Sequence, residues 1–397
     1  MRIKTINIIF ACWYLMIFSI GTEYLSKPMF LLELSTFLGL IMFIKLNMIK
    51  KKDLIVFLGM FIIVFGVIVS RLFYTANIPI PINILFVVKM TVFFMFMYIF
   101  MKHYQFPLKS LYIMSFFVFP HFIGYLFNLV PYVFGQIGGW HGDPNYLAPD
   151  LLTSFIASVF LVFNKKINSN KKIIFLVPLV ISLFLILLSI SRTALMSVLL
   201  SIALMTLLSF LHKKIKFVGL YTFISFFVFL IIFFTPLLDY ILNNSLYLKI
   251  EDRFLAKGGG SLQENERYIT WALAYDLIQE TGLFQGYGRE EFLQKVYRFA
   301  AHNVFLDIGI ISGSYTFWVF IYTYFFGFIF WFYTIAKNIK SLYLWSTDIF
   351  LFIFSLSVIF MMLSISVSHM YYFWFILYLI YTKLILYKYK KINRENQ

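Results

Sequence analysis

Three side chains suited to chemistry on phosphate and hydroxyl groups lie in the polar connections of this apolar chain. Arg192 stands in the tight turn Ser191-Arg192-Thr193, and Arg267 and His302 belong to the longest polar segment and its end. Guanidinium groups bind phosphate oxygens in pairs, and histidine is the usual general acid or base near neutral pH. The alternatives are a snorkelling arginine for Arg192, a surface salt bridge for Arg267, and a helix-capping or interface role for His302.

A second polar group precedes an apolar run that begins near residue 146. In Gly142-Asp143-Pro144-Asn145, Asp143 as N-cap and Pro144 as the first helical residue predict a helix start. Trp140 and His141 come just before it. Because apolar ring faces stack on carbohydrate, these two residues are candidates for contact with a sugar ring.

Three ionisable residues, Glu33, Arg71 and Lys89, fall in the outer parts of apolar runs. Charges at that depth are costly and are commonly paired or functional. Two interpretations stay open. Glu33 pairs with Lys89 or Arg71, or Lys89 or Arg71 faces a cavity that a lipid-linked phosphate can reach.

Membrane helices must position all of these residues. The 397-residue chain is 62% hydrophobic and 13% charged, against roughly 25% charged in a soluble domain. Apolar runs of bilayer-spanning length recur throughout, which predicts an all-α polytopic protein with a single membrane domain, residues 1–397. The twelve predicted spans are 5–22, 28–45, 54–72, 83–101, 110–130, 146–163, 173–190, 193–211, 217–237, 314–335, 347–366 and 369–386.

The basic residues gather in every second connection between these spans. By the positive-inside rule both termini are cytoplasmic and the other connections face outward. The formal charge of +16 does not indicate nucleic-acid binding, because short separate clusters form no contiguous basic face. The single cysteine, Cys12, excludes an intramolecular disulfide and a cysteine metal cluster. No metal or nucleotide motif is present either, so we expect no metal and no cofactor.

The outward segment 239–301 is the longest polar stretch. A connection of this length within a compact bundle is usually functional or disordered. Residues 265–279 can form a helix with a broad apolar side, suited to lying on the membrane surface or packing over the bundle. Gly258-Gly259-Gly260 before it predicts a flexible joint.

Four pieces of the chain, in this order, resemble the O-antigen ligase and polymerase superfamily of bacterial envelope proteins. They are Gly142-Asp143-Pro144-Asn145, Ser191-Arg192-Thr193, Arg267 through Trp271 to Gly286-Tyr287-Gly288, and His302-Asn303. Their order, spacing and common outward side carry the resemblance, which covers nearly the whole chain.

The resemblance implies transfer of a glycan from undecaprenyl diphosphate to an acceptor hydroxyl, without metal or nucleotide, at the periplasmic face of the bacterial inner membrane. It implies that Arg192 and Arg267 bind the donor diphosphate, that His302 activates the acceptor, and that the anomeric carbon is inverted. By the same resemblance, Asp143, Asn145 and Asn303 join the candidate substrate-binding residues.

One departure from the family concerns the residues before the Asp-Pro-Asn element. Many relatives have an arginine there, whereas this chain has Gly138-Gly139-Trp140-His141. His141, Arg71 and Lys89 are the candidates for the role of that arginine.

The quoted residues do not separate a polymerase from a ligase cleanly. We favour the polymerase, because the Asp-Pro-Asn element and the Gly-x-Gly turn are more similar to that branch. A transporter of lipid-linked oligosaccharide would place charges along a path through the bilayer centre, whereas the ionisable residues here collect at the outer side. The expected partners are an undecaprenyl diphosphate-linked oligosaccharide and membrane lipid, with a polysaccharide chain-length regulator as a further candidate and no nucleic acid.

Overall fold

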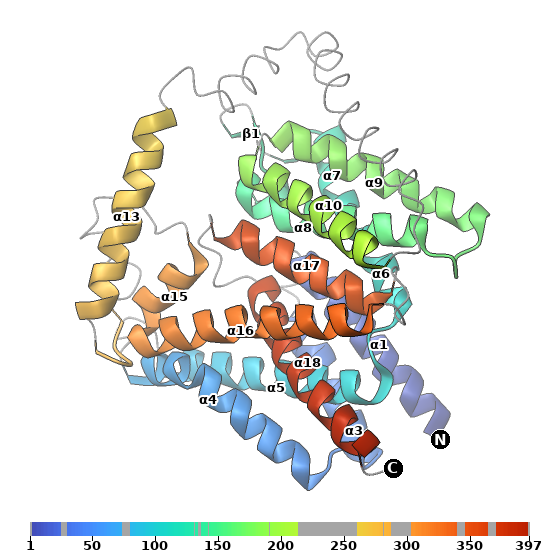
Figure 1. The fold of residues 1–397 in the computed structure, drawn as a ribbon, viewed down its shortest axis with the longest axis vertical. Helices are drawn as coiled ribbons and strands as arrows, with labels where there is room; N and C mark the ends of the chain where they lie inside the picture. The colour runs from blue at the N-terminus through green and yellow to red at the C-terminus, as the bar shows by residue number, and fades with distance from the viewer. Residues whose placement is uncertain are drawn as a thin grey trace.

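The structure is a computed structural model, and it describes most of the chain outside the long polar segment. The described residues are 2–24, 30–73, 80–130, 132–133, 136–141, 143–189, 191–212, 260–280, 282–286, 303–339, 346–363 and 371–395. They form a bundle of helices with one very short hairpin (Figure 1).

The first half of the bundle contains α1 (Arg2–Gly21), α3 (Leu31–Lys45), α4 (Lys51–Phe73), α5 (Ile80–Tyr104), α6 (Leu108–Ser115), α7 (Val118–Leu126), the 3₁₀ turn η1 (Gly139–His141) and α8 (Pro144–Phe163). The second half contains α9 (Ser169–Ser189), α10 (Arg192–His212), α13 (Gly260–Glu280), α15 (Val304–Ser312), α16 (Ser314–Asn338), α17 (Thr347–Met362) and α18 (Tyr371–Glu395). The hairpin pairs β1 (Tyr132–Val133) antiparallel to β2 (Gln136–Ile137), with Tyr132 opposite Ile137.

Six of the described helices are long and apolar enough to cross a membrane. They contain Ile3–Gly21, Lys51–Ser70, Ile84–Tyr104, Asn145–Phe163, Ser169–Ser189 and Ser314–Asn338. Shorter apolar helices cover Thr193–Leu208, Thr347–Met362 and Tyr371–Tyr387. The predicted all-helical, multi-pass architecture is confirmed at this level. The count of twelve spans stays a prediction, and the span 217–237 lies outside the described residues.

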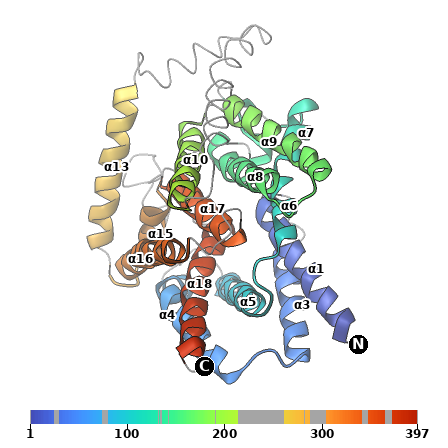
Figure 2. The ribbon, with the colours of Figure 1, turned by 45° about the vertical axis from the view of Figure 1, so that its right-hand side comes forward.

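The start of α1 and the end of α18 lie at the same end of the bundle in both views (Figures 1 and 2). At the start of α4, Lys102 of α5 donates to both carboxylate oxygens of Asp53, at 2.6 and 2.7 Å. This ion pair joins two ends of helices whose flanking lysines predict a cytoplasmic position. The orientation in the membrane stays a prediction.

The predicted span 110–130 is wrong as a single helix, because the chain breaks between α6 and α7. Pro120 has no N–H to donate to the carbonyl of Phe116, four residues earlier. Ser154 of α8 fills the gap. Its hydroxyl donates to the carbonyl of Ser115 and accepts from the backbone N–H of Val118, both at 2.9 Å. These two hydrogen bonds of Ser154 fix the direction of α7 relative to α6.

Helix α13 stands at one side of the bundle beside α15 (Figure 2) and includes residues 265–279. The turn that follows it packs tightly against the end of α15. A Cβ on Gly286 would lie 2.2 Å from the carbonyl oxygen of Ile310, so only glycine fits there. The backbone N–H of Tyr315 donates to the carbonyl of Leu283 at 3.0 Å, which ties this turn to the start of α16.

Candidate functional site

The structure brings together two of the four sequence motifs at the start of α8 and α10. Asp143 is the N-cap of α8, and its carboxylate accepts from the backbone N–H of Asn145 at 2.7 Å. The hydroxyl of Ser191 donates to the side-chain oxygen of Asn145 at 3.3 Å. Arg192 follows as the first residue of α10. Its backbone therefore stands next to the Asp-Pro-Asn element, although the two are far apart in sequence.

The other two motifs belong to neighbouring helices, α13 and α15. Arg267 belongs to α13, and Asn303 is the N-cap of α15, where its side-chain oxygen accepts from the backbone N–H groups of Phe305 and Leu306 at 3.0 and 3.3 Å. The two helices contact each other through Ile278 and Gly309, where a Cβ would lie 2.8 Å from the Ile278 side chain. His302 lies outside the described residues, as do the side chains of Arg192 and Arg267.

Lys89 forms the ion pair with Glu33 that the sequence left open as one of two interpretations. Its amine also donates to the hydroxyl of Tyr371 at 2.9 Å. Arg71 lies near the end of α4, and its side chain is outside the described part of the structure. The neighbouring Ser70 donates to the carbonyl of Ile311 at 2.8 Å, which places this end of α4 beside α15.

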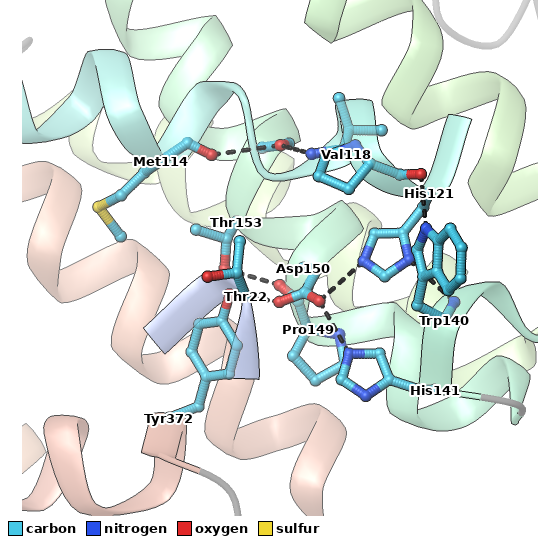
Figure 3. Close-up of polar contacts among 12 residues, drawn as sticks. Thr22, Met114, Val118, His121, Trp140, His141, Pro149, Asp150, Thr153 and Tyr372 are labelled. Atoms are coloured by element: carbon cyan, nitrogen blue, oxygen red, sulfur yellow. Dashed lines mark hydrogen bonds and ion pairs between the residues drawn. The ribbon is translucent and has the colours of Figure 1, made fainter. Parts of the chain in front are cut away.

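A buried carboxylate in α8, Asp150, organises the polar residues around the Asp-Pro-Asn element (Figure 3). One of its oxygens accepts from His121 of α7 at 3.0 Å and from His141 of η1 at 2.9 Å. The other oxygen accepts from the hydroxyl of Tyr372 at 2.7 Å. The backbone N–H of the preceding residue, Tyr371, donates to Glu23 at 2.9 Å, which fixes the start of α18 beside the end of α1. We call His121, His141, Asp150 and Tyr372 the Asp150 cluster.

The two histidines of the Asp150 cluster differ in what their second nitrogen does. The Nδ1 atom of His121 accepts from the backbone N–H of Trp140 at 3.3 Å, so the ring proton belongs on Nε2, which faces Asp150. His121 therefore uses both nitrogens within the protein. His141 also faces the carboxylate with Nε2, and in the described structure no residue is bonded to its Nδ1.

The ring nitrogens of His121 and His141 and a carboxylate oxygen of Asp150 lie within 4.8 Å of one another, and these are atom types that zinc accepts. A histidine that binds a metal normally donates its other ring N–H to an acceptor. His121 does the opposite, because its Nδ1 accepts an N–H. A neutral imidazole in that state has a proton on Nε2 and no lone pair there for a metal. The geometry fits a hydrogen-bonded carboxylate better than a metal centre.

Aromatic rings surround the exposed side of the cluster. Trp140 is 39% exposed, and its indole N–H donates to the carbonyl of Pro120 at 2.7 Å, which fixes the ring. Tyr24 lies with its ring centroid 4.9 Å from that of His121 and 5.1 Å from that of His141. Burial, and to a lesser extent the charge of Asp150, raises the pKa of the Tyr24 phenol, so this hydroxyl stays protonated as a donor.

Comparison with known families bears on the part of the chain that contains the two arginines and His302. Residues 177–321 match the family model described as O-antigen ligase. The matched segment covers less than half of the chain. The resemblance inferred from the motifs is confirmed there, and it supports a membrane transferase of the O-antigen ligase or polymerase type. No curated protein and no solved structure matches the chain.

The matched segment begins within α9 and ends within α16. The Asp150 cluster lies outside it, because three of its residues precede the segment and Tyr372 follows it. The family match therefore says nothing about the role of the cluster.

Sequence reasoning singled out His141 and missed the other three residues of the cluster. A signal existed for two of them, because Asp150 and His121 are ionisable residues inside predicted spans, 146–163 and 110–130. The same argument selected Glu33 and Lys89. No sequence signal identified Tyr372, whose contact with Asp150 joins residues 222 positions apart.

Proposed function

We propose that the protein is a glycosyltransferase that polymerises undecaprenyl diphosphate-linked oligosaccharide repeat units into a surface polysaccharide. The reaction is metal-independent and inverting, and it takes place at the periplasmic face of the bacterial inner membrane. The observation that carries this proposal is the match of residues 177–321 to the O-antigen ligase family, because this segment includes Arg192, Arg267 and His302.

The proposed chemistry is a single displacement. His302 takes the proton of an acceptor hydroxyl as its oxygen attacks the anomeric carbon of the donor sugar. The bond between that carbon and the diphosphate oxygen breaks, and the diphosphate leaves with the electron pair. Arg192 and Arg267 stabilise the negative charge that develops on it.

The remaining candidate residues have proposed binding roles around this centre. The contact of Ser191 with Asn145 supports a common site for the Asp143–Asn145 element and Arg192, and the contact of α13 with α15 supports one for Arg267 and Asn303. Trp140 and His141 are proposed to bind sugar, and Arg71 and Lys89 to face the lipid-linked phosphate. Lys89 would have to exchange its ion pair with Glu33 to do so.

The test is polymerisation by the purified protein in liposomes, supplied only with the lipid-linked repeat unit isolated from a polymerase-deficient strain of the producing bacterium. A ladder of lengths on a gel is expected from the wild-type protein and none from His302→Ala. Arg192→Lys should also reduce the ladder strongly, because an ammonium group retains the charge but not the paired hydrogen bonds. His103→Ala, a change at the predicted cytoplasmic end of α5, is the matched control and should retain the ladder.

A ligase is the second candidate function, favoured by the description of the matching family. It would transfer the glycan to lipid A-core instead of to another repeat unit. Product formed only after lipid A-core is added would establish the ligase and exclude the polymerase. Product in neither assay would reject both and favour a transporter of lipid-linked oligosaccharide.

A further inference from the structure

The Asp150 cluster fixes the position of His141 and leaves one of its ring nitrogens unused by the described residues. Asp150 accepts from Tyr372 and from His121, whose own proton is assigned to Nε2 by its contact with Trp140. A carboxylate that only accepts requires a proton on Nε2 of His141 as well. Figure 3 shows the second ring nitrogen of His141, Nδ1, pointing away from Asp150.

The charge of the cluster selects against an anionic ligand. Asp150 is 1% exposed, and in the described residues no lysine or arginine bonds to it. The cluster thus offers a phosphate none of the lysine or arginine side chains suited to binding it. A sugar hydroxyl both donates and accepts hydrogen bonds, so it can pair with a histidine nitrogen in either state of that nitrogen.

The surroundings of His141 fit a sugar. The side chain of His141 is 11% exposed, while His121 is fully buried, so only the first can meet a ligand. Trp140 next to it offers an exposed indole held in place by Pro120. The hydroxyl of Tyr24 is buried and has no acceptor within the described part of the chain. An apolar ring, an unused imidazole nitrogen and a protonated hydroxyl are complementary to the ring face and hydroxyl groups of a saccharide.

We infer that His141 and Trp140 form a saccharide subsite, in which Nδ1 of His141 forms a hydrogen bond with a sugar hydroxyl and Trp140 stacks on the ring. Asp150 is the positioning residue that fixes His141, and His121 and Tyr372 fix Asp150. The inference rests on the proposed function for the identity of the sugar, which belongs to the lipid-linked repeat unit. The diphosphate binds elsewhere, on the arginine side of Asn145.

A substitution that keeps one nitrogen of His141 and removes the other tests this subsite. In His141→Gln the amide nitrogen takes the place of Nε2 and can still donate to Asp150, while nothing replaces Nδ1. The KM for the lipid-linked repeat should rise about tenfold with little change in kcat, as for the loss of one binding interaction made equally in the ground and transition states. His103→Gln is the matched control, because His103 also uses Nε2 within the protein, towards the carbonyl of Met48 at 3.2 Å.

Inhibition by sugar-free undecaprenyl diphosphate separates the two halves of the donor. Its inhibition constant should be the same for His141→Gln and the wild-type protein, since the diphosphate does not bind at His141. An unchanged KM in His141→Gln would overturn the subsite. So would a weaker inhibition by undecaprenyl diphosphate that matches the rise in KM, because it would place the anion at His141.

Nitrogen NMR on protein labelled with ¹⁵N-histidine gives a readout that does not depend on turnover. The signals of His141 are those missing from His141→Gln. The free oligosaccharide released from the repeat unit should shift the Nδ1 signal, and inorganic diphosphate should not. No shift with the oligosaccharide, a shift with inorganic diphosphate, or bound zinc that is lost in His121→Ala would overturn the inference. The NMR measurement tests the subsite even if no ladder is formed and the proposed function fails.

Discussion

Two buried carboxylates, Asp53 and Asp150, lie near the N-terminal ends of α4 and α8 and have opposite surroundings. Asp53 is 0% exposed and Asp150 is 1% exposed. Asp53 has the amine of Lys102 on both of its oxygens, the hydroxyl of Tyr98 at 3.1 Å and the backbone N–H of Lys50 at 2.8 Å. Asp150 has two imidazoles and a phenol, and no lysine or arginine among the described residues.

The difference separates a carboxylate that completes the fold from one that prepares a side chain for a ligand. All groups that bond to Asp53 belong to the protein, and a cation balances its charge. Among the partners of Asp150, His141 has a second nitrogen that no described residue uses. That unused nitrogen is available to a ligand, whereas Asp53 leaves no such group.

The largest effect is expected at Asp53 and on stability alone. Asp53→Asn leaves the charge of Lys102 without its partner, and breaking a buried pair in this way costs about 3 kcal/mol of the free energy of unfolding. Chemical denaturation in a mixture of lipid and detergent measures this loss. The polymerisation rate per folded molecule should stay within about twofold of the wild-type rate, because a stability change at this distance removes no transition-state contact. A large loss of the polymerisation rate in folded Asp53→Asn would show that Asp53 is not only structural.

At Asp150 the effect should fall on activity. In Asp150→Asn the amide nitrogen is a donor, and it faces either the histidines or Tyr372, which are donors too. His141 then loses its fixed position, and kcat/KM for the lipid-linked repeat should fall about 30-fold, which corresponds to about 2 kcal/mol. The free energy of unfolding should fall by less than in Asp53→Asn. Equal activity of the two variants would show that both carboxylates are structural.

The sequence predicts the helices better than it predicts the hydrogen bonds of Asp53 and Asp150. Long apolar runs specify spans, and α8, α9 and α16 follow the predicted ranges closely. The run 110–130 failed because its break depends on Ser154, a residue from another helix that supplies hydrogen bonds to Ser115 and Val118. A periodic pattern carries no information about such a partner.

For the candidate site, too, the sequence predicts the motifs but not the contacts between them. The motifs around Asn145 and Ser191 were identified separately, and the hydrogen bond between them was not. His141 was selected for contact with sugar, but its fixed proton depends on Asp150, His121 and Trp140 together. Hydrogen-bond assignments of this kind arise from the geometry of three elements, which the sequence alone does not contain.

The smallest expected effects come from one matched pair of substitutions that remove a single hydroxyl. Tyr372→Phe removes the 2.7 Å bond to Asp150, and Tyr98→Phe removes the 3.1 Å bond to Asp53. A hydrogen bond to a charged group contributes about 1.5 kcal/mol or more, so Tyr372→Phe should lower the free energy of unfolding by about that amount. Tyr98→Phe should cost about 0.5 kcal/mol, because Lys102 already holds both oxygens of Asp53.

Tyr372→Phe and Tyr98→Phe should also differ in their effect on the KM for the lipid-linked repeat. Loss of Tyr372 leaves one oxygen of Asp150 without its donor, so the carboxylate turns and His141 follows it, and the KM for the lipid-linked repeat should rise about threefold. Tyr98→Phe should leave the KM unchanged, because no residue bonded to Asp53 reaches the saccharide subsite. Two results would contradict this comparison: an equal rise in the KM for both variants, or a greater loss of stability in Tyr98→Phe. Either result would show that the ion pair with Lys102 does not explain the different roles proposed for Asp53 and Asp150.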